Sequence, residues 1–485
     1  MSSNRLKGYL AGYLPINFIE ALTALSIVVI YTRLLTPEQY GRYALAVTIV
    51  QWLQTLVFYW LCSGVARFHE ASRVQGQLPV LLSTVYMGAL SLNGLLAIGI
   101  VWVTASLDDS WRWLVIAGLA SLIARSLLLI DLERYRAARE VRLYTRLEGA
   151  QYIISLGLGV LLVSVTNGNP AAILWGSALA CSLVLLLDAS QLLRLLRPTA
   201  WSGEEARRLA RYGLPLAVSV LLGQILAKSD RFFIAWLMDD KAVGVYAVVY
   251  ALVDRPSTII FNWVGMATVP LAFAAMEREG PAAARQVMTN TGKTLVLLLL
   301  PCTVGLAVVA EPLAAVVFGV SFREEATWLI PWIALASLLY GAMVHYASHA
   351  FMIAQNTRRL LFINLAMVAV NMVCNFLLIP PFGLEGAVAA SILTYAIGLV
   401  ARLILARQFF PIPLVASHCF RGLLACGVMA ALVRAAALPA TLTGLLLSVL
   451  LGAIAYAAAA LLFNVADSRD WVMAHWRWAS TKEAP

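Results

Sequence analysis

The sequence predicts an all-α integral membrane protein with 14 transmembrane helices. Of its 485 residues, 61% are hydrophobic and 12% are charged, a balance far from that of a soluble globular protein. The apolar residues are gathered into long runs, and a hydrocarbon core of about 30 Å needs about 20 such residues at a rise of 1.5 Å per residue. Because the runs recur along the whole chain, they indicate a polytopic helix bundle.

The predicted spans form two sets of six and a final pair. We place the first set near residues 12–32, 43–63, 80–105, 111–130, 149–166 and 171–193. We place the second set near residues 213–238, 243–274, 287–310, 327–354, 360–379 and 386–406, and the pair near 415–436 and 443–464. The expected domains are therefore an N-terminal six-helix bundle at 1–196, a C-terminal bundle at 213–406, an extra helix pair at 415–464 and a cytoplasmic tail at 465–485.

The distribution of positive charge predicts the orientation of these spans. With the N-terminus in the cytoplasm, 25 of the 35 Lys and Arg residues fall on the cytoplasmic side and 6 on the opposite side. Since cytoplasmic connections carry an excess of Lys and Arg, both termini are expected in the cytoplasm of a bacterial cell with the chain in its inner membrane. Arg5 and Lys7 precede an apolar run too long for a signal peptide, so this run is the first predicted span.

Several classes of function are not supported by the sequence. Orientation accounts for the formal charge of +10, so nucleic acid is not an expected partner. The chain has no GxxxxGK[ST] loop, and the Gly157/Gly159 pair lies inside an apolar span, so neither ATP hydrolysis nor dinucleotide binding is supported. The six cysteines lie in or beside apolar segments without CxxC spacing and are predicted to be packing residues. We expect no cofactor, no metal and no covalent catalysis.

One hairpin motif occurs twice, at the same topological point in each half. The first copy reads TRLLTPEQYGRYALAVTIV from Thr32, and the second reads AWLMDDKAVGVYAVVYALV from Ala235. An offset of 203 residues superimposes Gly41 on Gly244. Parallel repeats predict two bundles related by pseudo-two-fold symmetry about the membrane normal, with a cleft between them, which is the plan of a transporter.

These residues resemble the polysaccharide exporter and O-antigen flippase branch of the multidrug/oligosaccharidyl-lipid/polysaccharide exporter superfamily. The similar stretches are RLLTPEQYGRYAL from Arg33 to Leu45, and SDRFFI followed by VGVYAVVY between Ser229 and Tyr250. The resemblance implies alternating-access movement of an undecaprenyl-diphosphate-linked oligosaccharide from the cytoplasmic to the periplasmic leaflet. The implied partners are this polyprenyl-diphosphate-linked oligosaccharide, membrane lipids, a polysaccharide polymerase and glycosyltransferases. In the related lipid II flippase branch the extra helix pair builds a groove for the polyprenyl tail; here the final pair is expected to do the same or to pack against lipid.

The seventh span carries the strongest candidates for substrate binding. An ionisable side chain at mid-membrane costs about 2.5–3.5 kcal/mol on insertion scales, so one that persists usually faces a wet cavity or a partner. Gln224, Lys228 and Arg231 stand at i, i+4 and i+7, which places them on one helical face. Ammonium and guanidinium groups suit the oxygens of a diphosphate. The alternative is that Arg231 pairs with Asp230 or Asp254 and links helices.

The eighth span adds the sequence Asp254-Arg255-Pro256 near its middle. Proline removes a backbone donor and disfavours helix at the preceding residue, so a kink beside a charged pair is expected. Arg255 is predicted to compensate the phosphates of the substrate together with Lys228 and Arg231. The alternative is that Asp254 is neutralised by Arg255 or Arg231.

Glu20 lies in the middle of the first span and is assigned to ion pairing or coupling. A buried carboxylate can take up a proton, because burial disfavours its charged form. The alternative is that Glu20 is the counter-ion of Lys228, Arg231 or Arg125.

Two polar sets in the second half are weaker candidates. Asn364, Asn371 and Asn375 lie on one face of the eleventh span and can bind sugar hydroxyls, although such amides commonly hydrogen-bond between membrane helices. His345 and His349 stand at i and i+4 without a third ligand close in sequence, so a zinc site is not predicted.

The connection from Asp131 to Gly149 is predicted to be an arginine-rich cytoplasmic loop. Its arginines are Arg134, Arg136, Arg139, Arg142 and Arg146. Anchoring to anionic lipid head groups explains them, and attraction of the cargo's diphosphate is the alternative.

The predicted function is therefore that of an inner-membrane flippase for a lipid-linked glycan, serving O-antigen, capsule or exopolysaccharide assembly, and not that of an enzyme. Two rivals stay open. A cation-coupled multidrug exporter would favour an acidic and aromatic cavity, whereas a non-transporting membrane scaffold of a glycan synthase complex would tolerate charge reversal in the seventh span.

Overall fold

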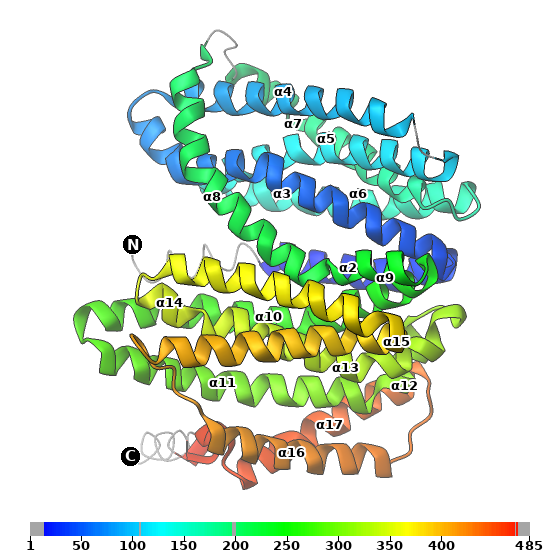
Figure 1. Cartoon of the computed structure of the whole chain (residues 1–485), viewed down its shortest axis with the longest axis vertical. Coiled ribbons are helices and arrows are strands. Elements are labelled where there is room, and N and C mark those ends of the chain that lie inside the picture. Colours follow the sequence, from blue (N-terminus) through cyan, green and yellow to red (C-terminus); the bar gives the residue numbers. More distant parts are fainter. Residues whose placement is uncertain (1–13, 106–107, 196–199, 471, 474–485) are drawn as a thin grey trace, which may run out of the picture. The chain divides into compact units, whose positions relative to one another are not determined.

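A computed structural model describes residues 14–105, 108–195, 200–470 and 472–473. Every regular element in this part of the chain is a helix, as Figure 1 shows. Thirteen of these helical segments are long and apolar enough to cross a membrane, so the chain is a multi-pass membrane protein. The helices fall into two compact units: the first holds the described residues up to Ala235 with Asp239–Gly244, and the second holds Trp236–Met238 and the described residues from Val245 onward.

The first unit contains seven long helices and most of a short one. They are α2 (Leu14–Leu34), α3 (Pro37–Val74), α4 (Leu78–Thr104), α5 (Asp109–Ala137), α6 (Val141–Val165), α7 (Ala171–Leu195), α8 (Gly203–Lys228) and α9 (Asp230–Leu237). Apolar clusters join most of these helices. One joins α3, α4, α5 and α8 around Phe58, Val85 and Leu209, and another joins α5, α6 and α7 around Leu128 and Val184.

The start of α3 is fixed by a capping box. The Thr36 hydroxyl accepts the Gln39 N–H, the Gln39 side chain accepts the Thr36 N–H, and Pro37 occupies the first helical position. Both contacts satisfy backbone donors that no turn of the helix can reach. The helix therefore begins at Pro37, six residues before the predicted span.

Small residues let helices of the first unit cross closely. A Cβ on Gly176 of α7 would lie 2.6 Å from the backbone nitrogen of Gly159 in α6. A Cβ on Gly213 of α8 would lie 2.5 Å from the carbonyl oxygen of Trp60 in α3. Such backbone approach drives helix association where lipid removes the hydrophobic contribution. Accordingly, α8 packs with the first unit, whereas the sequence analysis assigned residues 213–238 to the second bundle.

The second unit contains the remaining helices. They are α10 (Asp240–Arg278), α11 (Pro281–Val308), α12 (Ala310–Val317), η2 (Val320–Phe322), α13 (Arg323–Gly341), the π-helical η3 (Ala342–Ala347), α14 (His349–Ile353), α15 (Thr357–Ala406), α16 (Ala416–Ala435), α17 (Leu442–Leu462) and η4 (Val465–Asp467). Phe261, Leu295 and Leu299 join α10 to α11, and Cys426, Met429 and Tyr456 join α16 to α17.

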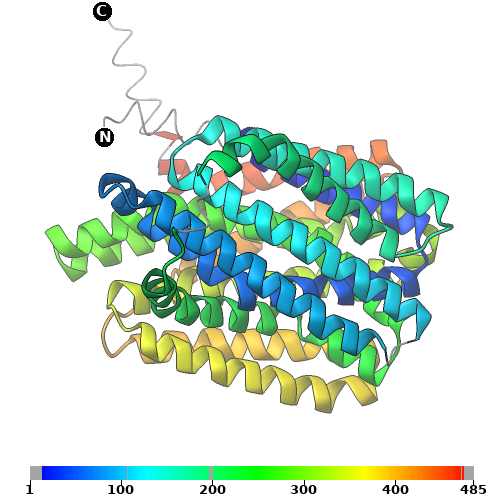
Figure 2. The ribbon, with the colours of Figure 1, turned by 90° about the horizontal axis from the view of Figure 1, so that it is seen from above.

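The element α15 consists of two arms. Gly383 has φ 56° and ψ −132°, a conformation that only glycine adopts readily, and it lies between the arms. Figures 1 and 2 show a yellow arm and an orange arm side by side. The predicted eleventh and twelfth spans lie on these arms. The count of 14 spans stays a prediction, because the 49 residues Arg358–Ala406 form one of the thirteen candidate segments.

The predicted arginine-rich loop is mostly helical, which corrects the sequence analysis. The helix α5 continues to Ala137, and α6 starts at Val141, so only three residues separate them. Arg134 and Arg136 lie in the last turn of α5, where positive side chains interact favourably with the helix dipole. The helices extend beyond the apolar runs because charged residues of this kind form helix readily once outside lipid.

Candidate functional site in the first helical unit

A polar seam joins α8 and α9 to α3. Gln224 Nε2 donates to Thr55 Oγ1 at 2.9 Å, and Lys228 Nζ donates to Gln51 Oε1. Arg231 Nη1 donates to Thr48 Oγ1 at 3.1 Å.

The three predicted residues thus share one face, as their spacing indicates, because the backbone stays helical through Ser229 between α8 and α9. Their acceptors repeat with the same period along α3, so the two helices meet in register. These contacts orient both cations through uncharged groups.

A polar cavity of about 210 Å³ lies beside this seam, inside the first unit. Residues from α2, α3, α5, α6 and α7 line it, and Gln51 belongs to both the cavity and the seam. Tyrosine rings, amides, hydroxyls and one guanidinium provide its polar surface. The polar lining includes Tyr31, Gln51, Gln54, Ser121, Arg125 and Ser177.

Arg125 supplies the positive charge of the cavity. Its Nη1 donates to Gln151 at 2.9 Å, and its Nη2 lies 3.7 Å from Glu148, whose side chain is 10% exposed. Gln54 Nε2 is buried and makes no hydrogen bond within the described residues. An amide donor and a guanidinium that face the same small space can bind hydroxyl or anionic oxygen atoms.

The other predicted site residues are spread over several elements. Glu20 is half-buried in α2, and Asp230 is 1% exposed in the first turn of α9. In α10, Asp254 accepts a hydrogen bond from Thr258 at 3.0 Å and Arg255 is exposed, while the helix continues through Pro256. The roles assigned to these residues stay predictions.

The asparagines of α15 contact protein groups. Asn375 Nδ2 donates to Asn371 Oδ1 at 3.0 Å, and both residues are fully buried. Asn364 Oδ1 accepts from Arg402 Nη2 at 2.6 Å. These protein contacts would compete with sugar hydroxyls for the same amide groups, and the contact with sugar stays a prediction.

Arg402 is a buried cation that sequence reasoning missed. It is 1% exposed, and its Nη1 donates to the carbonyl oxygen of Met343 at 2.6 Å. Met343 lies in the π-helical turn η3, where the i→i+5 pattern changes the backbone pairing. In the same turn His345 stacks on Phe261 with ring centroids 5.5 Å apart. Arg402 lies near the end of the predicted span 386–406, and no motif or spacing in the sequence singles it out.

An apolar groove of about 640 Å³ lies between α11, α16 and α17 in the second unit. Leu297, Gly305, Val433 and Gly452 are among its lining residues, and Ser468 lies at its polar end. The surface is almost entirely hydrocarbon, so the groove suits an apolar chain and not a charged group.

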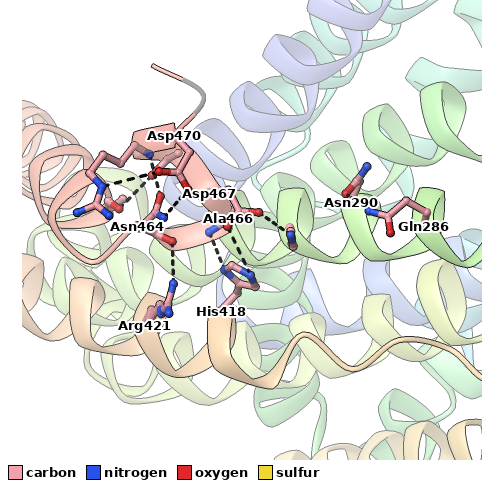
Figure 3. Close-up of polar contacts among 12 residues, drawn as sticks. Gln286, Asn290, His418, Arg421, Asn464, Ala466, Asp467 and Asp470 are labelled. Atoms are coloured by element: carbon pink, nitrogen blue, oxygen red, sulfur yellow. Dashed lines mark hydrogen bonds and ion pairs between the residues drawn. The ribbon is translucent and has the colours of Figure 1, made fainter. Parts of the chain in front are cut away.

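A polar turn follows α17 next to this groove. Asn464, Ala466 and Asp467 have φ of 51°, 55° and 58°, which non-glycine residues adopt only when contacts hold them. The Ala466 N–H donates to His418 Nδ1 at 3.1 Å, and Lys293 of α11 donates to Asp467. Figure 3 shows these contacts between the turn and the helices around it. The turn is therefore fastened to both α11 and α16.

The fold is that of known transporters and flippases. The lipid II flippase MurJ in its inward closed conformation superimposes with a TM-score of 0.75 over 94% of this chain and 98% of that chain, at 13% identity. An inward-facing multidrug resistance MATE family transporter of the MOP superfamily superimposes with a TM-score of 0.61 over 80% and 95%, also at 13% identity. These similarities show the class of fold.

The family follows from the sequence match. Residues 30–327 match the family described as polysaccharide biosynthesis protein, and because this is more than half of the chain, the chain belongs to that family. The probable flippase AglR of Haloferax volcanii is 22% identical over 366 residues, which cover 74% of each chain. The predicted membership in the polysaccharide exporter and flippase family is confirmed.

Proposed function

We propose that the protein is an inner-membrane flippase that moves an undecaprenyl-diphosphate-linked oligosaccharide from the cytoplasmic to the periplasmic leaflet by alternating access, for surface or exopolysaccharide assembly. The family and the flippase-type relatives support this function. The excess of Lys and Arg on one side supports a cytoplasmic position of both termini. The observation that carries the proposal is the seam in which α3 holds Lys228 and Arg231 beside a polar cavity.

The chemistry of the seam suits a diphosphate head group. Gln51 and Thr48 orient the two cations, and charge-assisted hydrogen bonds to phosphate strengthen where the dielectric is low. The role of Arg255 of α10 as a further phosphate contact stays a prediction from the sequence. Outward movement of a negative charge is favoured by about 2.3 kcal/mol per charge per 100 mV when the cytoplasm is negative. The membrane potential can therefore drive the loaded step without ATP.

The apolar groove suits the polyprenyl tail. Burial of each CH₂ group of a lipid chain contributes about 0.8 kcal/mol, and the groove offers a hydrocarbon surface along α11, α16 and α17. The tail would stay in this groove or in lipid while the glycan and diphosphate cross through polar surroundings. Membrane lipids are the remaining partners, and contacts with a polymerase or glycosyltransferases belong to the same proposal.

Charge reversal in the seam tests the proposal. In a deletion strain complemented with Lys228→Glu/Arg231→Glu, lipid-linked glycan should accumulate in the cytoplasmic leaflet, and polysaccharide export should fall to the level of the deletion. The matched control is Arg207→Glu, a reversal at an exposed position of α8 that should export normally. Normal export by the double variant, at wild-type abundance in the membrane, would contradict a phosphate site here and would favour the scaffold.

A cation-coupled multidrug exporter is the second candidate, because MATE transporters share the fold. It predicts that the deletion strain becomes sensitive to amphiphilic drugs while lipid-linked glycan is distributed normally. The same deletion strain therefore separates the two functions. Lipid-linked glycan accumulates in the cytoplasmic leaflet only if the deleted protein is a flippase.

A further inference from the structure

A buried cluster of charged residues joins α5 to α7 in the first unit. Arg134 Nη2 lies 2.7 Å from Asp131 Oδ1 and 2.8 Å from Asp188 Oδ2, so one nitrogen contacts both carboxylates. The side chains of Asp131, Arg134 and Asp188 are 1%, 7% and 6% exposed. Tyr135 donates to Asp188 at 2.6 Å, and Tyr86 of α4 donates to Asp131 at 3.1 Å.

The charges of this cluster do not balance. Within the described residues, two carboxylates face one guanidinium, and the other titratable groups packed nearby on α3, α4, α5 and α6 are a histidine and three phenols, which are uncharged at neutral pH when buried. These groups are His69, Tyr86, Tyr135 and Tyr144. A buried excess of one negative charge is costly, and two acids that share a site do not both ionise readily.

The oxygen atoms of Asp131 show where a proton would be held. Its Oδ1 receives hydrogen bonds from Tyr86 and Arg134, whereas its Oδ2 is buried and makes none within the described part of the chain. An ionised Oδ2 without a donor would bear the full cost of desolvation. A proton on the pair removes the excess charge and supplies a donor between the two acids.

A polar cavity of about 310 Å³ connects this cluster with the surface. Arg134 and Tyr135 line it from the cluster side, and His69 of α3 is 3% exposed with an Nδ1 that has no partner in the described residues. The outer lining carries two charges of each sign, which cancel. These charged residues are Glu70, Arg73, Arg139 and Glu140. The cavity thus reaches the Arg134 and Tyr135 side of the cluster, and its outer charges cancel.

We propose that Asp131 and Asp188 together form a proton-binding site that holds one proton, supplied through this cavity. Binding forms one O–H bond and leaves a single carboxylate for Arg134, with no oxidation or reduction. Release restores the second buried negative charge, which one guanidinium cannot balance, and so disfavours the packing of α5 against α7. In transport, the site would couple proton binding to movement of α5 against α7. This coupling role rests on the proposed function, whereas the proton-binding site does not.

Infrared difference spectroscopy of the purified full-length protein in detergent tests the site. Between alkaline buffer and mildly acidic buffer at about pH 6, in which exposed carboxylates stay ionised, the wild type should gain the carbonyl stretch of one protonated carboxylic acid. Asp131→Asn should lose this band, because Arg134 then neutralises the one remaining carboxylate. The matched control is Glu70→Gln, which removes an exposed carboxylate of the same cavity and should keep the band. The proposal would be overturned if the wild type showed no such band, or if the band remained in Asp131→Asn.

Thermal unfolding separates a proton site from a purely structural ion pair. Asp131→Asn imitates the protonated pair, so its melting temperature should equal that of the wild type in acidic buffer and exceed it in alkaline buffer. A loss of stability in both buffers would mean that both acids are needed as charges, and the proposal would fail. The leaflet assay reports on the proposed function separately, since the infrared band does not require transport.

Discussion

Asp467 links the turn after α17 to α11 through a hydrogen bond and ion pair with Lys293. The hydrogen bond from the Lys293 ammonium holds the pKa of the Asp467 carboxyl below its usual value. A lowered pKa means that the ionised form stabilises the fold, so the contribution is complete above the ordinary Asp pKa and disappears as pH falls through the lower value in the folded protein. Because the Asp467 side chain is 45% exposed, solvent screens the pair.

Asp467→Asn should therefore cost about 0.5 kcal/mol of stability at neutral pH and little in strong acid. Denaturant unfolding of the purified protein at about pH 7 and about pH 3, on either side of the ordinary Asp pKa, measures the difference. Asp470→Asn is a suitable comparison, because Asp470 contacts Asn464 and Arg469 at the exposed edge of the turn. If Asp467→Asn lost the same stability at both pH values, packing or uncharged hydrogen bonds, and not the ion pair, would stabilise the turn.

The sequence predicted the cations of the candidate site but not the residues that accept their hydrogen bonds. Lys228 and Arg231 are visible in the sequence because a charge inside an apolar run is rare and needs a reason. Their acceptors on α3 are Gln51 and Thr48, ordinary polar residues more than 170 positions away, which no spacing rule connects to α8.

The Asp131 cluster was missed for a different reason. Asp131 and Arg134 stand where an apolar run ends, so they were read as a surface loop, although the structure buries both. The available signal was their i, i+3 spacing, which continues a helix, together with Asp188 inside an otherwise apolar run. Only the packing of α5 on α7 brings these residues to one place.

At the scale of the elements, the repeated hairpin forms a reciprocal crossing within the first unit. A Cβ on Gly41 of α3 would meet the carbonyl oxygen of Asp240, and a Cβ on Gly244 would meet the carbonyl oxygen of Pro37. Pro37 and Asp240 are equivalent under the repeat offset found in the sequence, so each copy contacts the other in the same way. Arg42 and Asp240 add an ion pair at 2.8 Å. The local two-fold relation explains why glycine occupies this position in both copies.

Gly41→Ala and Gly244→Ala should each disrupt this crossing to a similar extent. An added methyl group would overlap a backbone carbonyl, which cannot move aside as a flexible side chain can, so a loss of about 1–3 kcal/mol is expected for each. The double variant should lose less stability than the sum of the two single variants, because either methyl group alone already pushes the two helices apart. Denaturant unfolding and the yield of folded protein measure the effect. Gly223→Ala in α8, where nothing lies within 4 Å, is the control that should change neither.

Helix positions were predictable because the length of apolar runs is set by the membrane. Helix ends were less predictable. The helix α3 extends from Pro37 to Val74, well beyond the predicted residues 43–63, because its capping box and polar turns lie outside the apolar run. The grouping of helices into two six-helix bundles and a pair stays a prediction. The helix α8 contacts α3 through Gly213 and the seam, and the spacing of the seam residues shows which face of α8 is polar but not which helix that face contacts.

For the whole molecule, the proposed function requires that polar and apolar parts of one substrate find different surfaces. The polar cavity lies in the first unit, and the apolar groove lies in the second. Two surfaces of opposite chemistry suit a lipid-linked glycan, which has a charged head and a hydrocarbon tail. A small amphiphilic drug would not require a groove of this size outside the polar cavity, so loss of the groove should distinguish the two cargo classes.

Gly305→Leu tests this distinction by filling the groove. Gly305 of α11 lines the groove and has nothing within 4 Å of an added Cβ, so a leucine enters open space without straining the helices. Gly427→Leu in α16 is the matched control, because that glycine is exposed, is equally free of neighbours and does not line the groove. Polysaccharide export should fall several-fold with Gly305→Leu and stay normal with Gly427→Leu, at equal abundance in the membrane. If both variants export normally, the tail does not use this groove, and the helix pair α16 and α17 serves only to pack against lipid.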